Sequence, residues 1–114
     1  MFDSVTSVAL QSALDGLSLR QRTIANNIAN INTPNYHAEK VRFEDTLAQS
    51  IVHGDGHAEA TTSRSLEPTN TNGNNVNLDQ ETLSNVDTVL RYQFATQAMN
   101  SELTSVRAAM RTNS

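Results

Sequence analysis

The stretch IANNIANINTPNY, residues 24–36, decides the fold because it combines a helical apolar pattern with a helix stop. Ile24, Ile28 and Ile31 are four and three residues apart, which keeps one apolar face of an α-helix continuous. Asparagine occupies five of the thirteen positions, although its side chain competes for backbone hydrogen bonds and makes it a mediocre helix former. Pro34 disfavours the helical conformation of the residue before it, so the sequence predicts a helix that ends here.

The four residues at this stop, Thr33 to Tyr36, have the composition of a tight turn. Pro34 favours the second position of a β-turn, and Asn35 in the third position tolerates the positive φ of a type II turn. The sequence therefore predicts a turn with a defined exit direction. Tyr36 is placed either to fold back on the helix end or to contact a neighbouring molecule.

Toward the N-terminus the same apolar spacing continues as a heptad seam. Seven positions separated alternately by four and three residues form it: Leu10, Leu14, Leu17, Gln21, Ile24, Ile28 and Ile31. Gln21 is its one polar member, and a polar residue inside such a seam costs stability but fixes register. The pattern predicts a helix from about residue 4 to residue 31, roughly 42 Å long at 1.5 Å per residue.

A second seam of nearly equal length lies near the C-terminus. Its members are separated by three and four residues: Val89, Tyr92, Thr96, Met99, Leu103, Val106 and Met110. Leu83, Val86 and Leu90 are expected to widen this stripe at its start. Acidic residues at the beginning and Arg111 at the end suit the helix dipole, so a helix over about 79–111 is predicted.

The segment between the seams, residues 32–78, divides into two parts. Phe43, Leu47 and Ile51 recur every four residues and predict a short amphipathic helix. Residues 52–75 are rich in Gly, Ser, Thr, Asn and charge, and such a segment buries too little apolar surface to offset the entropy of ordering. A mobile polar loop is therefore expected there.

These elements predict an all-α fold in which the N- and C-terminal helices pair as an antiparallel coiled-coil hairpin. One unit would contain the three segments 1–31, 32–78 and 79–114. The outward face of the first helix is unusually poor in charge and suggests a second contact surface, although a plain solvent face is the alternative. The residues expected on that face are Val5, Val8, Ala9, Gly16, Leu19, Asn26, Ala29 and Asn30.

Composition excludes several classes of protein. The chain has 114 residues, 37% of them hydrophobic, and a net charge of -4 with scattered basic residues, which gives nucleic-acid binding little support. It has no cysteine, so disulfides and zinc-thiolate sites are ruled out. No apolar stretch approaches 18 residues and the N-terminus lacks a basic region, so neither a membrane span nor a Sec signal peptide is expected.

Catalytic and cofactor motifs are also weak. His53, Asp55, His57 and Glu59 contain a pair of histidines four residues apart, a spacing that holds metal when it lies on a helix. Two glycines separate these histidines inside a polar stretch, so a solvated loop is the preferred interpretation and no metal or other cofactor is expected. No nucleophile motif or Gly-rich phosphate loop is present, so the chain is not expected to be an enzyme.

Two stretches give the chain a specific resemblance. LDGLSLRQRTIANNIANINTPNY (14–36) resembles the N-terminal signature of flagellar basal-body rod proteins, and residues 74–110 resemble the C-terminal part of the proximal rod member of that family. The family usually has Gly where this chain has Asn35, and asparagine is the next residue best able to adopt positive φ. The positions that match the signature are Asn26, Asn27, Asn30, Asn32, Pro34, Tyr36, Leu90, Arg91 and Tyr92.

The resemblance implies a function that composition alone does not. It implies that paired terminal helices stack into the rod, the axial drive shaft of the flagellum, on the periplasmic side of the cytoplasmic membrane. The implied partners are other copies of the chain, a FliE-type adaptor, an FlgC-type rod protein and the flagellar type III export apparatus. The signature amides would then serve contacts between subunits. The alternatives are a small coiled-coil adaptor or export chaperone that binds a partner helix, and a metal-dependent enzyme around His53 and His57.

Overall fold

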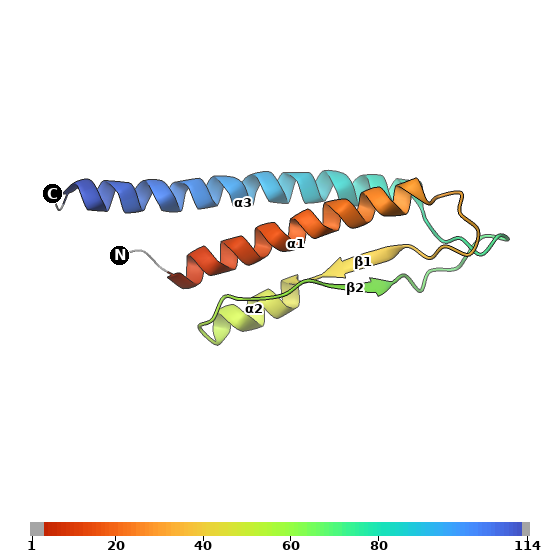
Figure 1. The fold of residues 1–114 in the computed structure, drawn as a ribbon, viewed down its shortest axis with the longest axis horizontal. Helices are drawn as coiled ribbons and strands as arrows, with labels where there is room; N and C mark the ends of the chain where they lie inside the picture. Colours follow the sequence, from red (N-terminus) through yellow and green to blue (C-terminus); the bar gives the residue numbers. More distant parts are fainter. Residues whose placement is uncertain (1–3, 113–114) are drawn as a thin grey trace.

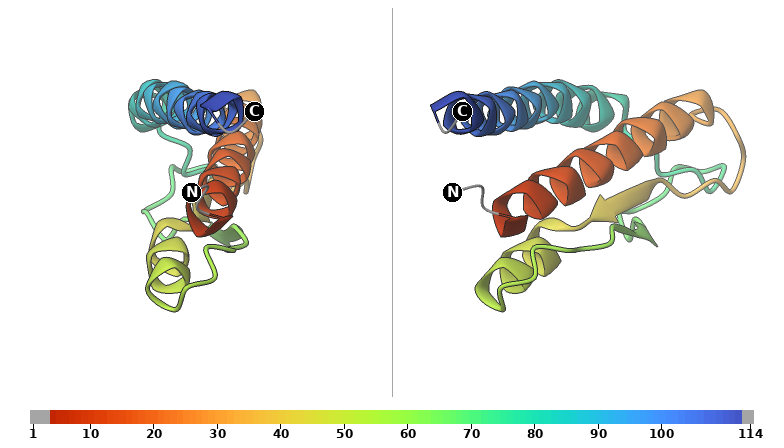
Figure 2. Two further views of the ribbon diagram at one scale, coloured as in Figure 1. Left: turned by 90° about the vertical axis from the view of Figure 1, so that its left-hand side faces the viewer. Right: turned by 60° about the vertical axis from the view of Figure 1, so that its left-hand side comes forward.

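The computed structural model describes residues 4–112 and is an elongated molecule of 67 × 25 × 14 Å. Its elements in chain order are α1 (Ser4–Ala29), β1 (Glu39–Arg42), α2 (Glu44–Val52), β2 (Thr61–Arg64) and α3 (Leu78–Thr112). Figure 1 shows α3 along one side of α1, with the strands and α2 on the other side. The end-on view in Figure 2 shows the same stacking, with α1 as the middle layer.

The two long helices form the predicted antiparallel hairpin. In Figure 1, α1 runs toward the connecting turns and α3 returns beside it, so both described ends of the chain lie at the same end of the molecule. α1 has 26 residues and α3 has 35, which correspond to about 39 Å and 52 Å of helix. The last turns of α3 therefore project past the beginning of α1.

The seam of α1 is confirmed. Leu17 and Ile24 are buried, and the other members of the seam are partly buried. The helix ends at Ala29, two residues before the predicted end, and Asn30 begins the turn. The turn itself is as predicted, because Asn35 has a φ of 62° and the amide of Tyr36 donates to the carbonyl of Thr33 at 3.3 Å.

The seam of α3 is only partly correct. Most of its members are partly buried, with Thr88 and Ala95 buried between them, but Leu103 and Met110 are exposed because the end of α3 extends past α1. Leu83, Val86 and Leu90 do not widen the buried stripe and lie mainly in solvent. The single helix α1 covers only one side of α3, so the opposite apolar side is left without a cover in this chain.

The core lies between α1, α3 and the segment that carries β1 and α2. Its buried members are Leu17, Val41, Phe43 and Ala95. Phe43 lies between β1 and α2 and packs on α1 at Gly16, where an added Cβ would be 2.5 Å from the ring carbon Cδ1. The expectation that Gly16 faces outward is therefore wrong, because α1 needs a residue without a side chain where the phenyl ring approaches.

A two-stranded antiparallel sheet, which the sequence did not predict, replaces part of the expected loop. β1 and β2 pair with Glu39 opposite Arg64 and Arg42 opposite Thr61. The region 52–75 therefore contains a strand, and it also contains the buried residues Ser65, Asn74 and Asn75. Backbone pairing and side-chain amides fix this region although it has few apolar residues, so the mobile-loop interpretation is corrected.

The short middle helix is confirmed as α2. Phe43, Leu47 and Ile51 recur along it as predicted; the first is buried, the second partly buried, and Ile51 is 46% exposed at the outer end. Among the helices of residues 4–112, none is both long and apolar enough to cross a membrane.

Candidate functional site: an asparagine joint at the end of the hairpin

The signature stretch folds into a polar cluster where α1, the following turn, β1 and the start of α3 meet. We call this cluster the asparagine joint. Its members are Asn26, Asn27, Asn30, Tyr36, Asn74, Asn75 and Glu81. The joint brings residues from both halves of the chain together across the polar segment that separates them in sequence.

Asn27 is the centre of the joint and is only 1% exposed. Its Nδ2 donates to the carbonyl of Glu39 at 2.9 Å and to Oε1 of Glu81 at 3.0 Å. Its Oδ1 accepts from the amide of Glu39 at 3.0 Å and from the hydroxyl of Tyr36 at 3.0 Å. One side chain therefore connects α1 to the turn, to β1 and to α3, and its bonds stay within the chain.

The free edge of β1 is covered by side chains of α1. Asn27 occupies both backbone groups of Glu39, and Nη2 of Arg20 donates to the carbonyl of Val41 at 2.8 Å. An uncovered strand edge is a template for unwanted pairing with another chain. The polar side chains of α1 thus take the place of a third strand.

Tyr36 folds back on the end of α1 as one of the two alternatives predicted. Its hydroxyl accepts from Nδ2 of Asn26 at 2.9 Å while it donates to Asn27. Burial raises the pKa of the Tyr36 phenol, and the neighbouring carboxylate of Glu39 adds to this effect.

Asn74 lies in the loop before α3 and completes the joint. Its side chain is fully buried (0% exposed). Its Nδ2 donates to the carbonyls of Asn30 and Thr33 at 2.9 and 2.8 Å, and its Oδ1 accepts from the amide of Val76 at 2.8 Å. Both carbonyls lie in the turn after α1 and also accept backbone amides of that turn, so Asn74 holds this turn against the loop before α3.

Asn75 connects the same loop to the residue before β1 and to the residues after β2. Its Oδ1 accepts from the amide of Ala38 at 2.7 Å, and its Nδ2 donates to the carbonyls of Ser65 and Glu67, both at 3.1 Å. The polar composition of residues 52–75 predicts only a loop at Asn74 and Asn75. The signal that could have identified it was a pair of neutral amides beside an Asn-Gly turn, since amides satisfy backbone groups of both kinds.

The other signature residues are distributed around the joint. Nδ2 of Asn30 donates to the carbonyl of Asn26 at 2.8 Å, and its Oδ1 accepts from the hydroxyl of Thr33 at 3.0 Å. Asn32 and Pro34 are exposed on the turn. The joint therefore presents an outer polar surface as well as its buried centre.

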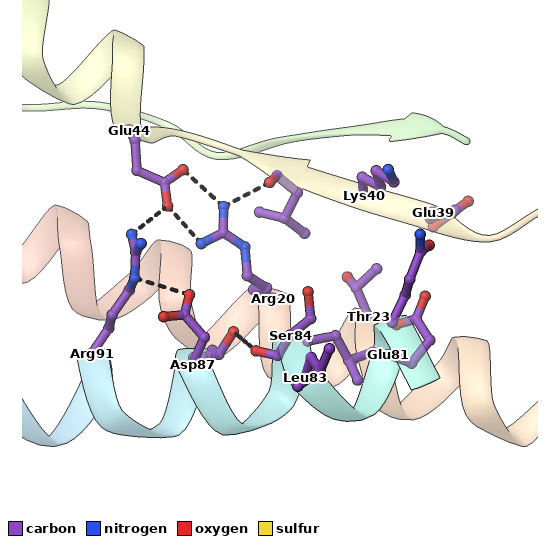
Figure 3. A pocket seen from close by; sticks show the side chains of 14 residues that line it. Arg20, Thr23, Glu39, Lys40, Glu44, Glu81, Leu83, Ser84, Asp87 and Arg91 are labelled. Atoms are coloured by element: carbon purple, nitrogen blue, oxygen red, sulfur yellow. Dashed lines mark hydrogen bonds and ion pairs between the residues drawn. The ribbon is translucent and has the colours of Figure 1, made fainter. Parts of the chain in front are cut away.

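The three C-terminal signature residues point in different directions. Leu90 is 60% exposed, and Tyr92 is partly buried against the core. Arg91 lies at a groove of about 530 Å³ between α1, β1 and α3, where its Nε is 3.0 Å from Asp87 and its Nη1 is 3.6 Å from Glu44 (Figure 3). These residues do not form one site.

Arg20 is the main charged connection in this groove. Its two terminal nitrogens lie 2.6 and 2.8 Å from the two carboxylate oxygens of Glu44, and its guanidinium lies 5.0 Å from the centre of the Phe43 ring. The hydrogen bond from Arg20 lowers the pKa of the Glu44 carboxyl, against the opposing effect of burial. A bidentate pair of this kind fixes geometry as well as charge, so it holds the start of α2 on α1.

The pKa of the Glu81 carboxyl is shifted in the opposite direction from that of Glu44. Burial raises the pKa of its carboxyl, and this outweighs the hydrogen bond from Asn27 and the attraction of Lys40, which both lower it. The folded chain therefore holds the Glu81 proton at a pH where the unfolded chain releases it. The stability that comes from this proton is present at low pH and is lost as the pH rises through the raised pKa.

The variant Glu81→Gln tests this pH dependence. We expect the difference in free energy of unfolding between the original chain and the variant to fall as the pH rises from the ordinary pKa of glutamate through the raised value. Urea unfolding followed by circular dichroism across that window measures it. Glu44→Gln is the matched control. For this variant the difference in free energy of unfolding should grow as the pH rises, because a carboxylate with a lowered pKa stabilises the folded chain when it is ionised. A flat difference for Glu81→Gln would contradict the assignment.

The histidine-containing stretch forms no metal cluster. Within residues 4–112, no group of three or more His, Asp or Glu side chains is arranged to hold a metal ion. His53, Asp55, His57 and Glu59 are all exposed on an irregular segment.

A second surface feature lies on the exposed side of α3, and its first member, Leu83, also lines the edge of the groove between α1, β1 and α3. Leu83, Val86, Leu90 and Phe94 are 71%, 54%, 60% and 76% exposed. Their spacing of three, four and four residues places them on one helix face over roughly 16 Å. We call these four residues the outer stripe of α3.

Comparison with known proteins identifies relatives over nearly the whole chain. Residues 9–37 match the family model described as "Flagella basal body rod protein". The chain is similar to the flagellar basal body rod protein FlgB of Bacillus subtilis, with 32% identity over 89% of each chain. It is also similar to FlgB of Borreliella burgdorferi, with 29% identity over 86% of this chain and 90% of that protein. FlgB of Salmonella typhimurium shows 29% identity over 82% and 83% of the two chains.

Proposed function

Because the chain belongs to the FlgB family of flagellar basal body rod proteins, we propose that its α1–α3 hairpin is the unit that polymerises with other copies. The chain is a structural subunit of the proximal rod of the bacterial flagellar basal body. Its role depends on packing between helices and requires no catalysis by the chain itself. Rotation of the motor would be transmitted through these helix contacts as the rod turns.

The outer stripe of α3 is the observation that carries the polymerisation proposal. Four large apolar side chains on one helix face are more than half exposed, while the opposite face packs on α1. A surface helix normally turns its apolar face inward and its polar face to solvent. An apolar outer face on a helix that already has a partner supports contact with helices of neighbouring subunits, and a repeated contact of this type builds an open assembly.

The asparagine joint makes the hairpin rigid at one end. The buried residues Asn27 and Asn74 use their amides inside the chain, so they position the helices and do not themselves meet a neighbour. The exposed signature residues Asn26, Asn32 and Pro34 lie on the outside of the joint. We assign contacts between subunits to these outer residues, together with the partly buried Asn30.

The place of the subunit and its partners follow as proposals from the family. The chain would travel through the flagellar type III export apparatus and take its place on the periplasmic side of the cytoplasmic membrane. It would there contact a FliE-type adaptor and an FlgC-type rod protein. Long helices stabilised largely by neighbouring subunits suit this route, because a marginal fold costs little to open before transport.

Fractionation of cells tests the proposed role against the alternative of a cytosolic adaptor or export chaperone. We expect the tagged chain to purify with detergent-extracted basal bodies, and a deletion strain to lack complete rods and to be non-motile. Complementation with the original chain should restore both. Recovery of the chain only in the cytosol, in complex with a partner helix, would support the alternative instead.

A further inference from the structure

A basic hollow of about 500 Å³ lies along β1, β2 and the residues that follow β2. Residues that line it include Lys40, Arg42, Ser63, Arg64, Leu66 and Glu67. It carries three of the eight Lys and Arg residues of a chain whose net charge is -4. The hollow is therefore locally positive on a molecule that is negative as a whole.

The three cations of this hollow form no ion pair among the described residues, although Glu67 also lines the hollow and Lys40 attracts the carboxylate of Glu81. Arg20 and Arg91 form ion pairs within the groove, whereas Lys40, Arg42 and Arg64 have none within 4 Å in the part of the chain that the structure describes. The guanidinium of Arg64 contacts Nδ1 of His37. The surface is thus suited to a negatively charged occupant.

The same chain offers such an occupant in residues 55–59, which we call the acidic ridge. Ser12 fixes this segment to α1, because its hydroxyl donates to the carbonyl of Gly56 at 3.2 Å and accepts from the amide of Ala58 at 3.2 Å. Gly56 and Ala58 are buried, while Asp55 and Glu59 are exposed on either side of them. The ridge is therefore a segment that is fixed to α1 and that exposes the carboxylates of Asp55 and Glu59.

Among the described residues no ion pair joins the ridge to the hollow within one molecule. Only Ala60 separates the ridge from β2, and Figure 1 shows this part of the chain running on from α2 into β2 along the sheet side of α1. The two segments therefore follow one another along the chain, the acidic one first and the basic one after it. A two-fold axis near Ala60 would place the acidic half of each copy on the basic half of the other.

We propose that two copies of this chain form a closed, two-fold pair in which the acidic ridge of each occupies the basic hollow of the other. A two-fold interface must be self-complementary, and an acidic half followed by a basic half meets that requirement. This pair goes beyond the rod function, since a two-fold contact closes on itself and does not extend. It provides a state in which subunits associate without polymerising through α3.

Electrostatics sets the strength of this pair. Exposed ion pairs are individually weak, so charge complementarity contributes mainly orientation and exclusion of wrong partners. The expected dissociation constant is therefore high, on the order of 0.1–1 mM. Screening should weaken the pair further as salt is raised.

Sedimentation equilibrium of the purified full-length chain at about 1 mM, near the expected dissociation constant, tests the pair. One variant, Lys40→Glu/Arg42→Glu, makes the hollow acidic, and a second, Asp55→Lys/Glu59→Lys, makes the ridge basic. We expect the dissociation constant for self-association of each variant alone to rise at least about fivefold, because like charges then face each other. An equal mixture of the two should recover a complex with the mass of two chains, since both opposed surfaces are again complementary.

The control is Arg107→Glu, which changes an exposed charge on α3 outside both surfaces and should leave association unchanged. Recovery in the mixture also demonstrates that both charge variants are folded. A monomeric original chain at this concentration, or undiminished association of either variant, would overturn the two-fold pair. None of these results bears on the rod function, which fractionation with basal bodies tests separately.

Discussion

Replacement of Asn27 by leucine is expected to remove about 3 kcal/mol from the free energy of unfolding, a large part of the stability of a small domain. Leucine has a similar size but no polar atoms, so the backbone groups of Glu39 and the carboxylate of Glu81 would lose their partner. Unpaired polar groups in a buried site carry a desolvation penalty that exceeds the value of the bonds when made. Urea unfolding of the purified chain, followed by circular dichroism, measures the loss.

The matched control for this change is Asn26→Leu. Asn26 belongs to the same signature run and its side chain donates to the same tyrosine, but it is exposed, so water can replace its bond to Tyr36. We expect this variant to lose less than about 1 kcal/mol. Similar losses for the two variants would show that the buried centre of the joint is no more important than its rim.

These two variants also separate folding from assembly. Asn27 is enclosed by its own chain, so a defect at this position should appear in the isolated protein as lower stability. Asn26 lies on the outer surface of the joint, and its replacement should affect rod assembly more than the stability of the subunit. Unfolding and basal-body fractionation of the same pair of variants measure the two effects independently.

Replacement of Gly16 by alanine should also destabilise the chain, by about 2 kcal/mol, although alanine is normally the better helix residue. The new Cβ would lie 2.5 Å from Cδ1 and 2.6 Å from Cγ of Phe43. Phe43 is only 3% exposed and its ring has the guanidinium of Arg20 near it at 5.0 Å, so the ring cannot move aside freely. The steric penalty therefore exceeds the gain in helix propensity.

A second change at the same contact tests this explanation. In the double variant Gly16→Ala/Phe43→Leu the smaller side chain makes room for the Cβ, so part of the loss should be recovered relative to the sum of the two single changes. Thermal and urea unfolding of the two single variants and the double variant give this coupling. A stabilised Gly16→Ala variant, or losses that simply add, would contradict a direct clash with Phe43.

The two heptad seams and the helix stop could be predicted because they depend on local sequence. Regular spacing of apolar residues determines which face of a helix is buried, and a proline determines where the helical conformation ends. The positive φ of Asn35 follows from the same kind of local preference. These features need no knowledge of which distant segments come together.

The sheet, Gly16 and the outer stripe were missed or misplaced because they depend on the partner of each segment. β2 has no apolar pattern, and its pairing with β1 uses backbone groups that every sequence possesses. Gly16 has the spacing of an outward residue, yet the ring of Phe43 covers it. Leu90 has the spacing of an inner residue, yet α1 covers only the opposite side of α3.

The signature stretch, residues 24–36, contains both features that depend on local sequence and features that depend on distant partners. The sequence alone determined that residues 24–36 form a helix end followed by a tight turn, because spacing, proline and asparagine preferences are local. Only the tertiary structure decided that Asn27 is buried and that Asn74 bonds the turn after α1 from 44 residues away along the chain. A side-chain amide can bond to almost any backbone group, so its partner is fixed only when the whole chain brings one within reach.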